Sequence, residues 1–105
     1  MKFDVLTLFP EMIESCCSCS ILKRAVESGV IEINTINPRD FTEDKHKKVD
    51  DTPYGGGAGM VLMAQPFVDA YESIEKSEKS ITIMLTPQGE VFDEKMGKEF
   101  AQYEQ

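Results

Sequence analysis

The sequence predicts an α/β domain, with a parallel sheet and flanking helices, that occupies residues 1–105 as one domain. Strand-like apolar segments occur at residues 2–8, 30–37 and 81–85, and helix-like segments separate them. Strands that alternate with helices pair in parallel through right-handed crossovers. A length of 105 residues also suits one small domain.

The first half of the chain is expected to form a strand, a helical segment and a second strand. Residues 2–8 alternate and then become apolar, which is typical of a buried strand. Pro10 suits the first turn of a helix, and Gly29 suits the position just after a helix ends. Residues 30–37 alternate again, and Pro38 ends this second strand.

The second half begins with a long segment that has few core-forming residues, at 39–59. Such a loop is uncommon in a compact domain unless it is functional. A helix is predicted from Gln65 to about residue 77, and a third strand at 81–85. Asp93 could cap a last helix that continues to about Tyr103.

The charge is distributed unevenly. The net charge of −8 argues mildly against a nucleic-acid ligand, because phosphate contacts usually need a basic surface. The acidic residues, however, concentrate after Asp69, whereas the segment 39–48 carries Arg39 and three lysines. A local contact with RNA therefore remains compatible with the sequence.

No segment suggests a membrane protein or a metal protein. The longest apolar runs have the length of strands, far short of the roughly 20 residues of a membrane span, and no signal peptide is visible, so we expect a cytoplasmic protein. Cys16, Cys17 and Cys19 are too close together for an unstrained disulfide framework. With His46 as the only histidine, no metal site is expected.

Two loops could carry chemistry, because ligands of open α/β sheets bind beyond the carboxyl ends of the strands. One contains the glycine run 55–59, whose backbone amides a flat or anionic ligand could approach closely. A flexible hinge is the alternative interpretation. The other is the turn Thr86–Gly89 after the predicted third strand, which could equally be an ordinary β-turn. The two loops can lie side by side if their strands are neighbours.

Acidic residues precede the glycine run. Asp50 and Asp51, with His46 nearby, could act in acid–base chemistry or bind the edge of a base. The alternative is a solvated turn.

Five blocks in order along the chain resemble a known family: Leu8–Met12, Pro38–Thr42, Val49–Met60, Gln65–Pro66 and Leu85–Gly89. They are similar to the bacterial tRNA (guanine-N1)-methyltransferases, which belong to the knotted SPOUT superfamily. The block around Tyr54-Gly55-Gly56-Gly57 is the most specific, although Ala58 stands where many members have proline.

The resemblance implies methyl transfer from S-adenosylmethionine to N1 of the guanosine that follows the anticodon on its 3′ side, by a homodimer that binds tRNA. Residues matching the loop beside the cofactor's adenosyl group are Leu85, Thr86, Pro87, Gln88 and Gly89. Residues matching positions near the target guanine or the tRNA are Arg39, His46, Asp50, Tyr54, Gly55, Gly56, Gly57 and Gly59.

The family's knot loops, its general base and its C-terminal tRNA-binding domain lie beyond the last matched block. The resemblance therefore implies an N-terminal part of the methyltransferase domain, truncated before the knot, with no catalytic residue of its own. Alone, such a chain is expected to bind the cofactor weakly and to turn over nothing. The alternatives are a non-catalytic RNA- or nucleotide-binding module and a fragment that self-associates through an exposed sheet edge.

Overall fold

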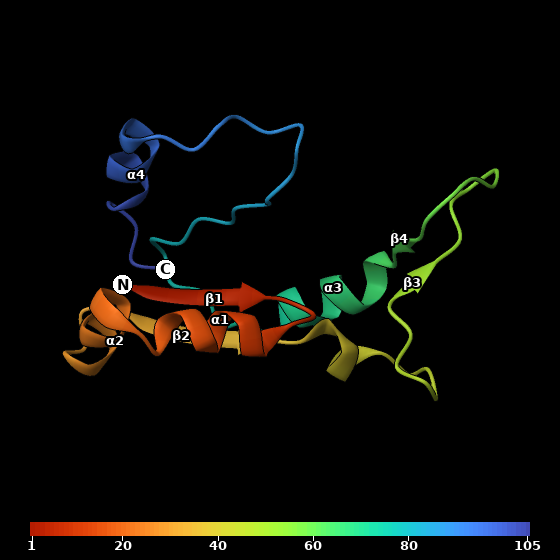
Figure 1. Ribbon diagram of the computed structural model, residues 1–105, viewed down its shortest axis with the longest axis horizontal. Coiled ribbons are helices and arrows are strands. Elements are labelled where there is room, and N and C mark those ends of the chain that lie inside the picture. The colour runs from red at the N-terminus through yellow and green to blue at the C-terminus, as the bar shows by residue number, and fades with distance from the viewer.

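The structure, a computed structural model, describes all residues from 1 to 105 and is elongated, with extents of 46 × 30 × 29 Å (Figure 1). A two-stranded parallel sheet and its helices form one end. A thin hairpin projects from the other end, and α4 (Glu94–Phe100) lies above the sheet.

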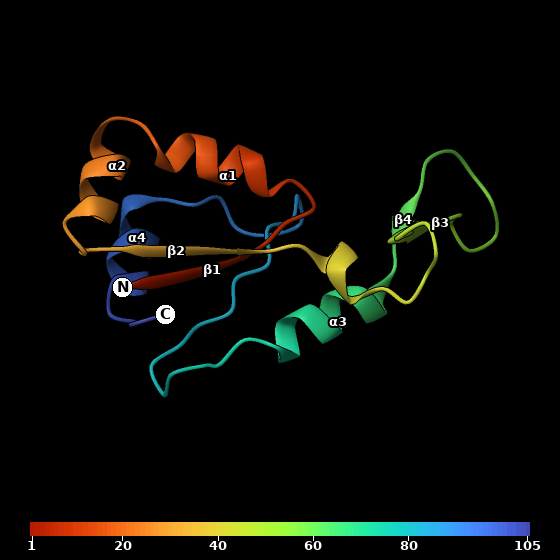
Figure 2. The same cartoon turned by 90° about the horizontal axis from the view of Figure 1, so that it is seen from below.

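The parallel sheet consists of β1 (Lys2–Leu6) and β2 (Glu32–Ile36), paired along their whole length. The crossover between them contains α1 (Pro10–Cys17) and α2 (Ser20–Glu27). Figure 2 shows both helices on one side of the sheet and α3 (Ala64–Glu72) on the other. The parallel pair with flanking helices confirms the predicted α/β class.

Local sequence signals explain the ends of these helices. Pro10 occupies the first turn of α1, as predicted. The helical segment is interrupted at Cys19, which is extended and precedes α2. Gly29 follows the end of α2 with a φ of 77°, the left-handed conformation that glycine adopts without strain.

The segment predicted as a long loop contains a 3₁₀ turn, η1 (Pro38–Phe41), and the first strand of a small antiparallel hairpin. This hairpin pairs β3 (Asp50–Asp51) with β4 (Val61–Leu62). Strands of two residues are too short to leave an alternating pattern, so the sequence did not reveal them.

A small core anchors the base of this hairpin. Four of the 105 residues are buried. They are Pro38, Val49, Pro66 and Ala70. Helix α3 (Ala64–Glu72) packs against η1, and the Met63 N–H donates to the Val49 carbonyl oxygen at 2.7 Å. The hairpin is therefore fixed at its base.

The third strand predicted at residues 81–85 is wrong for this structure. These residues form no ladder, and the Ile81 N–H donates to the Gln105 carbonyl oxygen at 3.0 Å. Met84 is 84% exposed and Leu85 is 92% exposed. An apolar run becomes a strand only when another strand lies within hydrogen-bonding distance, and β1 does not lie directly beside this segment.

The last two helices are shorter than predicted. Helix α3 ends at Glu72 instead of about residue 77, and α4 ends at Phe100 instead of about Tyr103. Asp93 caps α4 as predicted, because its Oδ1 accepts a hydrogen bond from the Met96 N–H at 2.8 Å. None of the helices has the length and apolar character needed to cross a membrane.

Candidate substrate-binding loops

The glycine loop, residues 54–59, is the tip of the β3–β4 hairpin and stands clear of the rest of the molecule (Figure 1). The Gly56 N–H donates to the Pro53 carbonyl oxygen at 3.1 Å and closes a turn. Gly57 has a φ of 120°, and no atom lies within 4 Å of where a Cβ would be. Tyr54 is fully exposed. The loop thus presents bare backbone and one aromatic ring to solvent.

Asp50 and Asp51 lie at the base of this loop, in β3 opposite Leu62 and Val61. The Thr52 N–H donates to Asp51 Oδ1 at 2.8 Å, and the ammonium of Lys48 is 3.7 Å from the same oxygen. The backbone hydrogen bond first, and the lysine charge second, hold the pKa of Asp51 below its ordinary value. Asp51 is thus engaged in local structure.

Arg39 and His46 lie in the segment that leads into the hairpin. Arg39 Nη1 donates to the Lys47 carbonyl oxygen at 3.1 Å. Asp44 Oδ2 accepts from the N–H groups of Lys48 at 3.0 Å and His46 at 2.9 Å, and these bonds lower the pKa of Asp44. The carboxylate therefore shapes a turn, which leaves His46 exposed on the surface.

The second candidate loop, Leu85–Gly89, contains the predicted tight turn. The Gly89 N–H donates to the Thr86 carbonyl oxygen at 3.1 Å, and the Gln88 N–H donates to Thr86 Oγ1 at 3.3 Å. A Cβ on Gly89 would lie 3.3 Å from that carbonyl oxygen, so glycine suits this close approach.

The structure does not bring the two loops together. In both ribbon views they lie beyond the carboxyl-terminal half of β1 but stand apart along the long axis of the molecule (Figures 1 and 2). The hairpin fixes one loop, whereas the other follows residues 81–85, which no ladder holds in the sheet. The two loops are thus held by different parts of the fold.

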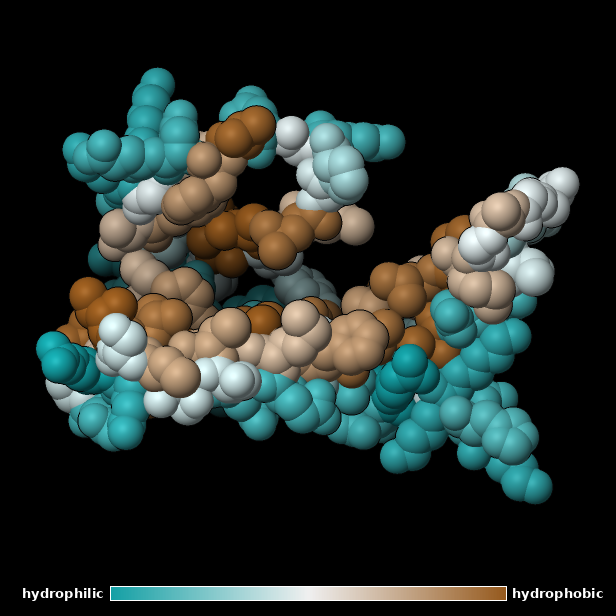
Figure 3. All heavy atoms as spheres, in the orientation of Figure 1, coloured by the Kyte–Doolittle hydropathy of each residue, from teal (hydrophilic) through white to brown (hydrophobic).

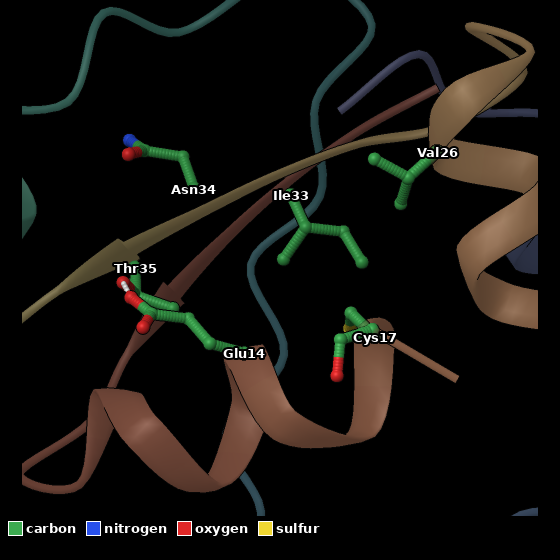
Figure 4. Close-up of a pocket in the computed structure, with 7 residues that line it drawn as sticks. Glu14, Cys17, Val26, Ile33, Asn34 and Thr35 are labelled. Carbon is green, nitrogen blue, oxygen red and sulfur yellow. Dashed lines mark hydrogen bonds between the residues drawn. The ribbon is translucent and has the colours of Figure 1, made fainter.

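A depression of about 380 Å³ lies elsewhere, between α1, α2 and β2 (Figure 4). Glu14 and Thr35 meet there, with the Thr35 hydroxyl donating to Glu14 Oε1 at 3.2 Å. Cys17 lines the same depression and is a free thiol, as are Cys16 and Cys19. None of the residues predicted to bind tRNA or cofactor lines it, and no sequence motif pointed to it.

Comparisons with known proteins agree with the resemblance of the five blocks. The family described as tRNA (Guanine-1)-methyltransferase TrmD matches residues 1–105. A tRNA (guanine-N(1)-)-methyltransferase of Caldicellulosiruptor saccharolyticus is 57% identical over 105 residues, which are 100% of this chain and 43% of that protein. One from Carboxydothermus hydrogenoformans is 56% identical over 104 residues, 99% of this chain and 41% of the relative.

A solved structure is also similar. The crystal structure of a tRNA (m1G37) methyltransferase from Aquifex aeolicus matches with a TM-score of 0.63 and 40% identity, over 69% of this chain and 32% of that one. The fold and the matched sequence define a domain of the methyltransferase class. The chain belongs to the tRNA (guanine-1)-methyltransferase family, which confirms the predicted family, and it spans about 43% of the length of the first relative.

Proposed function

We propose that the chain is the N-terminal part of a tRNA methyltransferase that transfers a methyl group from S-adenosylmethionine to N1 of the guanosine 3′ to the anticodon. The observation that carries the proposal is the family match over all of residues 1–105. The identity of 57% to a relative named tRNA (guanine-N(1)-)-methyltransferase supports it. The intact protein acts in the cytoplasm as a homodimer.

In this proposal the two loops have different ligands. The turn Leu85–Gly89 holds the adenosyl group through main-chain atoms other than the Thr86 carbonyl oxygen and the N–H groups of Gln88 and Gly89, which the turn itself uses. The loop Tyr54–Gly59 receives the guanine, because glycine backbone lets a flat ring approach closely. Asp50, at the base of the hairpin, is the candidate contact to the base edge.

In the same proposal, Arg39 and His46 contact the tRNA backbone. They belong to the segment 39–48, which carries four basic side chains in a chain of net charge −8. This segment connects directly to the glycine hairpin, so in this proposal one bound tRNA contacts both. Binding should weaken as the salt concentration rises.

Removing the N1 proton of guanine needs a positioned base, and the proposal assigns no residue of this chain to that role. It places the base in the remainder of the intact protein, so the chain alone should not catalyse. For the same reason, calorimetry should show S-adenosylmethionine binding to the chain more weakly than micromolar, because only one of the loops around the cofactor is present.

The experiment uses the intact protein, labelled S-adenosylmethionine and two tRNA transcripts, one with guanosine and one with adenosine at the position 3′ to the anticodon. Digestion to nucleosides should yield N1-methylguanosine from the first transcript only. The chain of residues 1–105, assayed in parallel, should yield none. Methylation of a different atom, or equal labelling of both transcripts by the intact protein, would contradict the proposal.

A further inference from the structure

The turn Leu85–Gly89 belongs to a stretch of chain, residues 82–92, that has a single hydrogen bond to the rest of the molecule. The hydroxyl groups of Tyr71 and Thr82 share this bond at 2.9 Å. The other hydrogen bonds of the stretch close the turn on Thr86 and stay inside it. The bond to Tyr71 therefore lies just ahead of the turn along the chain.

Side-chain packing does not replace the missing hydrogen bonds of this stretch. Leu85 is 92% exposed and Val91 is 88% exposed. Figure 3 shows a hollow between the sheet and the part of the chain that carries α4. The stretch thus has little support from the sheet, and the bond between Tyr71 and Thr82 is its one polar tie to a helix.

Tyr71 is itself held in place by Lys76. The ammonium of Lys76 lies 4.0 Å from the centroid of the Tyr71 ring, a cation–π contact. The same ammonium donates to the carbonyl oxygens of Tyr71 at 2.9 Å and Ile74 at 3.2 Å. It thereby satisfies carbonyl groups at the end of α3 that have no partner within the helix. The Tyr71 ring is therefore restricted in orientation where its hydroxyl meets Thr82.

Helix α3 is fixed at its other end to the base of the glycine hairpin. The Met63 N–H, just before the helix, donates to the carbonyl oxygen of the buried Val49 at 2.7 Å. Along the helix, Pro66 and Ala70 are buried, and the helix packs against η1. Because Ala70 directly precedes Tyr71, the tyrosine stands on a well-packed part of the molecule.

We propose that Tyr71 is a positioning residue for the cofactor turn. Through the hydroxyl of Thr82 it ties the turn Leu85–Gly89 to α3. The inference rests on the proposed function, in which this turn holds the adenosyl group. A turn that is already in place loses less conformational freedom when its ligand binds. Removal of the bond therefore weakens cofactor binding and leaves the chemical step unchanged, because Tyr71 contacts neither the cofactor nor the guanine in this proposal.

The test uses the intact protein with four variants. Tyr71→Phe removes only the hydroxyl and keeps the ring beside Lys76. Thr82→Val removes the other hydroxyl at nearly constant shape, and a double variant combines the two changes. Thr82→Ser retains a hydroxyl and should restore the bond. Calorimetry gives the dissociation constant of S-adenosylmethionine, and steady-state methylation of the guanosine transcript gives kcat and the KM for tRNA.

The dissociation constant of the cofactor should rise roughly 3- to 10-fold in Tyr71→Phe and in Thr82→Val, the loss expected for one hydrogen bond. The double variant should lose no more than either single variant, because both changes remove the same bond. Thr82→Ser should bind as the unchanged protein does. At saturating cofactor, kcat and the KM for tRNA should stay within about 2-fold in all variants.

The matched control is Tyr103→Phe, the same change at a tyrosine without a hydrogen bond to residues 82–92. It should leave the affinity for the cofactor unchanged. An unchanged affinity in Tyr71→Phe would overturn the positioning role, even if the thermal midpoint fell. Losses that add in the double variant would overturn it as well, as would a weaker affinity in Tyr103→Phe of the same size.

The unchanged protein separates this inference from the proposed function. If it forms no N1-methylguanosine, the proposed function fails, and the positioning role falls with it. If it forms N1-methylguanosine while Tyr71→Phe binds the cofactor equally well, only the positioning role of Tyr71 fails.

Discussion

The carboxylate of Asp4 accepts a hydrogen bond from the side-chain amide of Gln105 at 2.7 Å, and so joins the first strand to the last residue of the chain. The same carboxylate accepts from Asn34 of β2 at 2.9 Å. An acid inside an apolar strand is therefore explained by its position between two neighbouring segments. It links β2, β1 and the C-terminal residues across the sheet.

Asp4→Ala should destabilise the chain by about 1–3 kcal/mol, because it leaves the amide groups of Asn34 and Gln105 without their acceptor. The measurement is urea-induced unfolding followed by circular dichroism. Glu99→Ala is the control, because Glu99 is an exposed acid of α4. Equal midpoints for the two variants would show that the Asp4 contacts do not stabilise the fold.

The Asp4 contacts should also produce a pH dependence. Burial raises the pKa of Asp4, but the hydrogen bonds from Asn34 and Gln105 and the charge of Lys2 together hold it below its ordinary value. Such a carboxylate adds stability above the unfolded-state pKa, and this contribution disappears as the pH falls through the folded-state pKa. The stability advantage over Asp4→Asn should therefore shrink below the ordinary aspartate pKa. An advantage that is constant down to the acid unfolding transition would contradict this assignment.

Val49→Ala should loosen the base of the glycine hairpin. Val49 is 1% exposed, and its carbonyl oxygen accepts the Met63 N–H at 2.7 Å. Loss of two buried methyl groups should cost about 1–3 kcal/mol. Val61→Ala, at a position 53% exposed, is the matched control and should change the urea midpoint little. Similar losses for both variants would mean that Val49 is not the anchor.

Gly57→Ala should strain the hairpin tip, since Gly57 has a φ of 120° that a residue with a Cβ rarely adopts. The expected cost is about 1 kcal/mol or somewhat more. It should appear as faster amide exchange at Met63, whose N–H closes the hairpin base. Ala58→Gly, at the neighbouring position, lacks this strain and is the control. If both variants exchange alike, the conformation of Gly57 is not what holds the loop.

The sequence predicted those parts of the fold that depend on local signals. Pro10 and Asp93 marked the starts of helices, Gly29 marked the end of one, and the alternating pattern of residues 30–37 marked β2. The prediction of a strand at residues 81–85 was wrong for a non-local reason. A strand needs a hydrogen-bonding neighbour, and the pattern of one segment does not say whether that neighbour is present.

The candidate site, too, has features that local sequence signals predicted and features that they did not. The turn at Thr86 and the glycine conformations near Gly57 were predictable, because they follow from residue types within a few positions. The short strands β3 and β4, which carry the loop outward, were not. Nor was the distance between the two loops, because it depends on whether residues 81–85 belong to the sheet.

We propose that the glycine loop and the turn Leu85–Gly89, which bind the guanine and the cofactor in the proposed function, come together in the intact protein. The most direct test is a spin-label distance between positions 58 and 88, measured by pulsed electron resonance in a background with serine in place of Cys16, Cys17 and Cys19. We expect a long, broad distribution in the chain of residues 1–105 and a shorter, narrower one in the intact protein. The same distribution in both would contradict it.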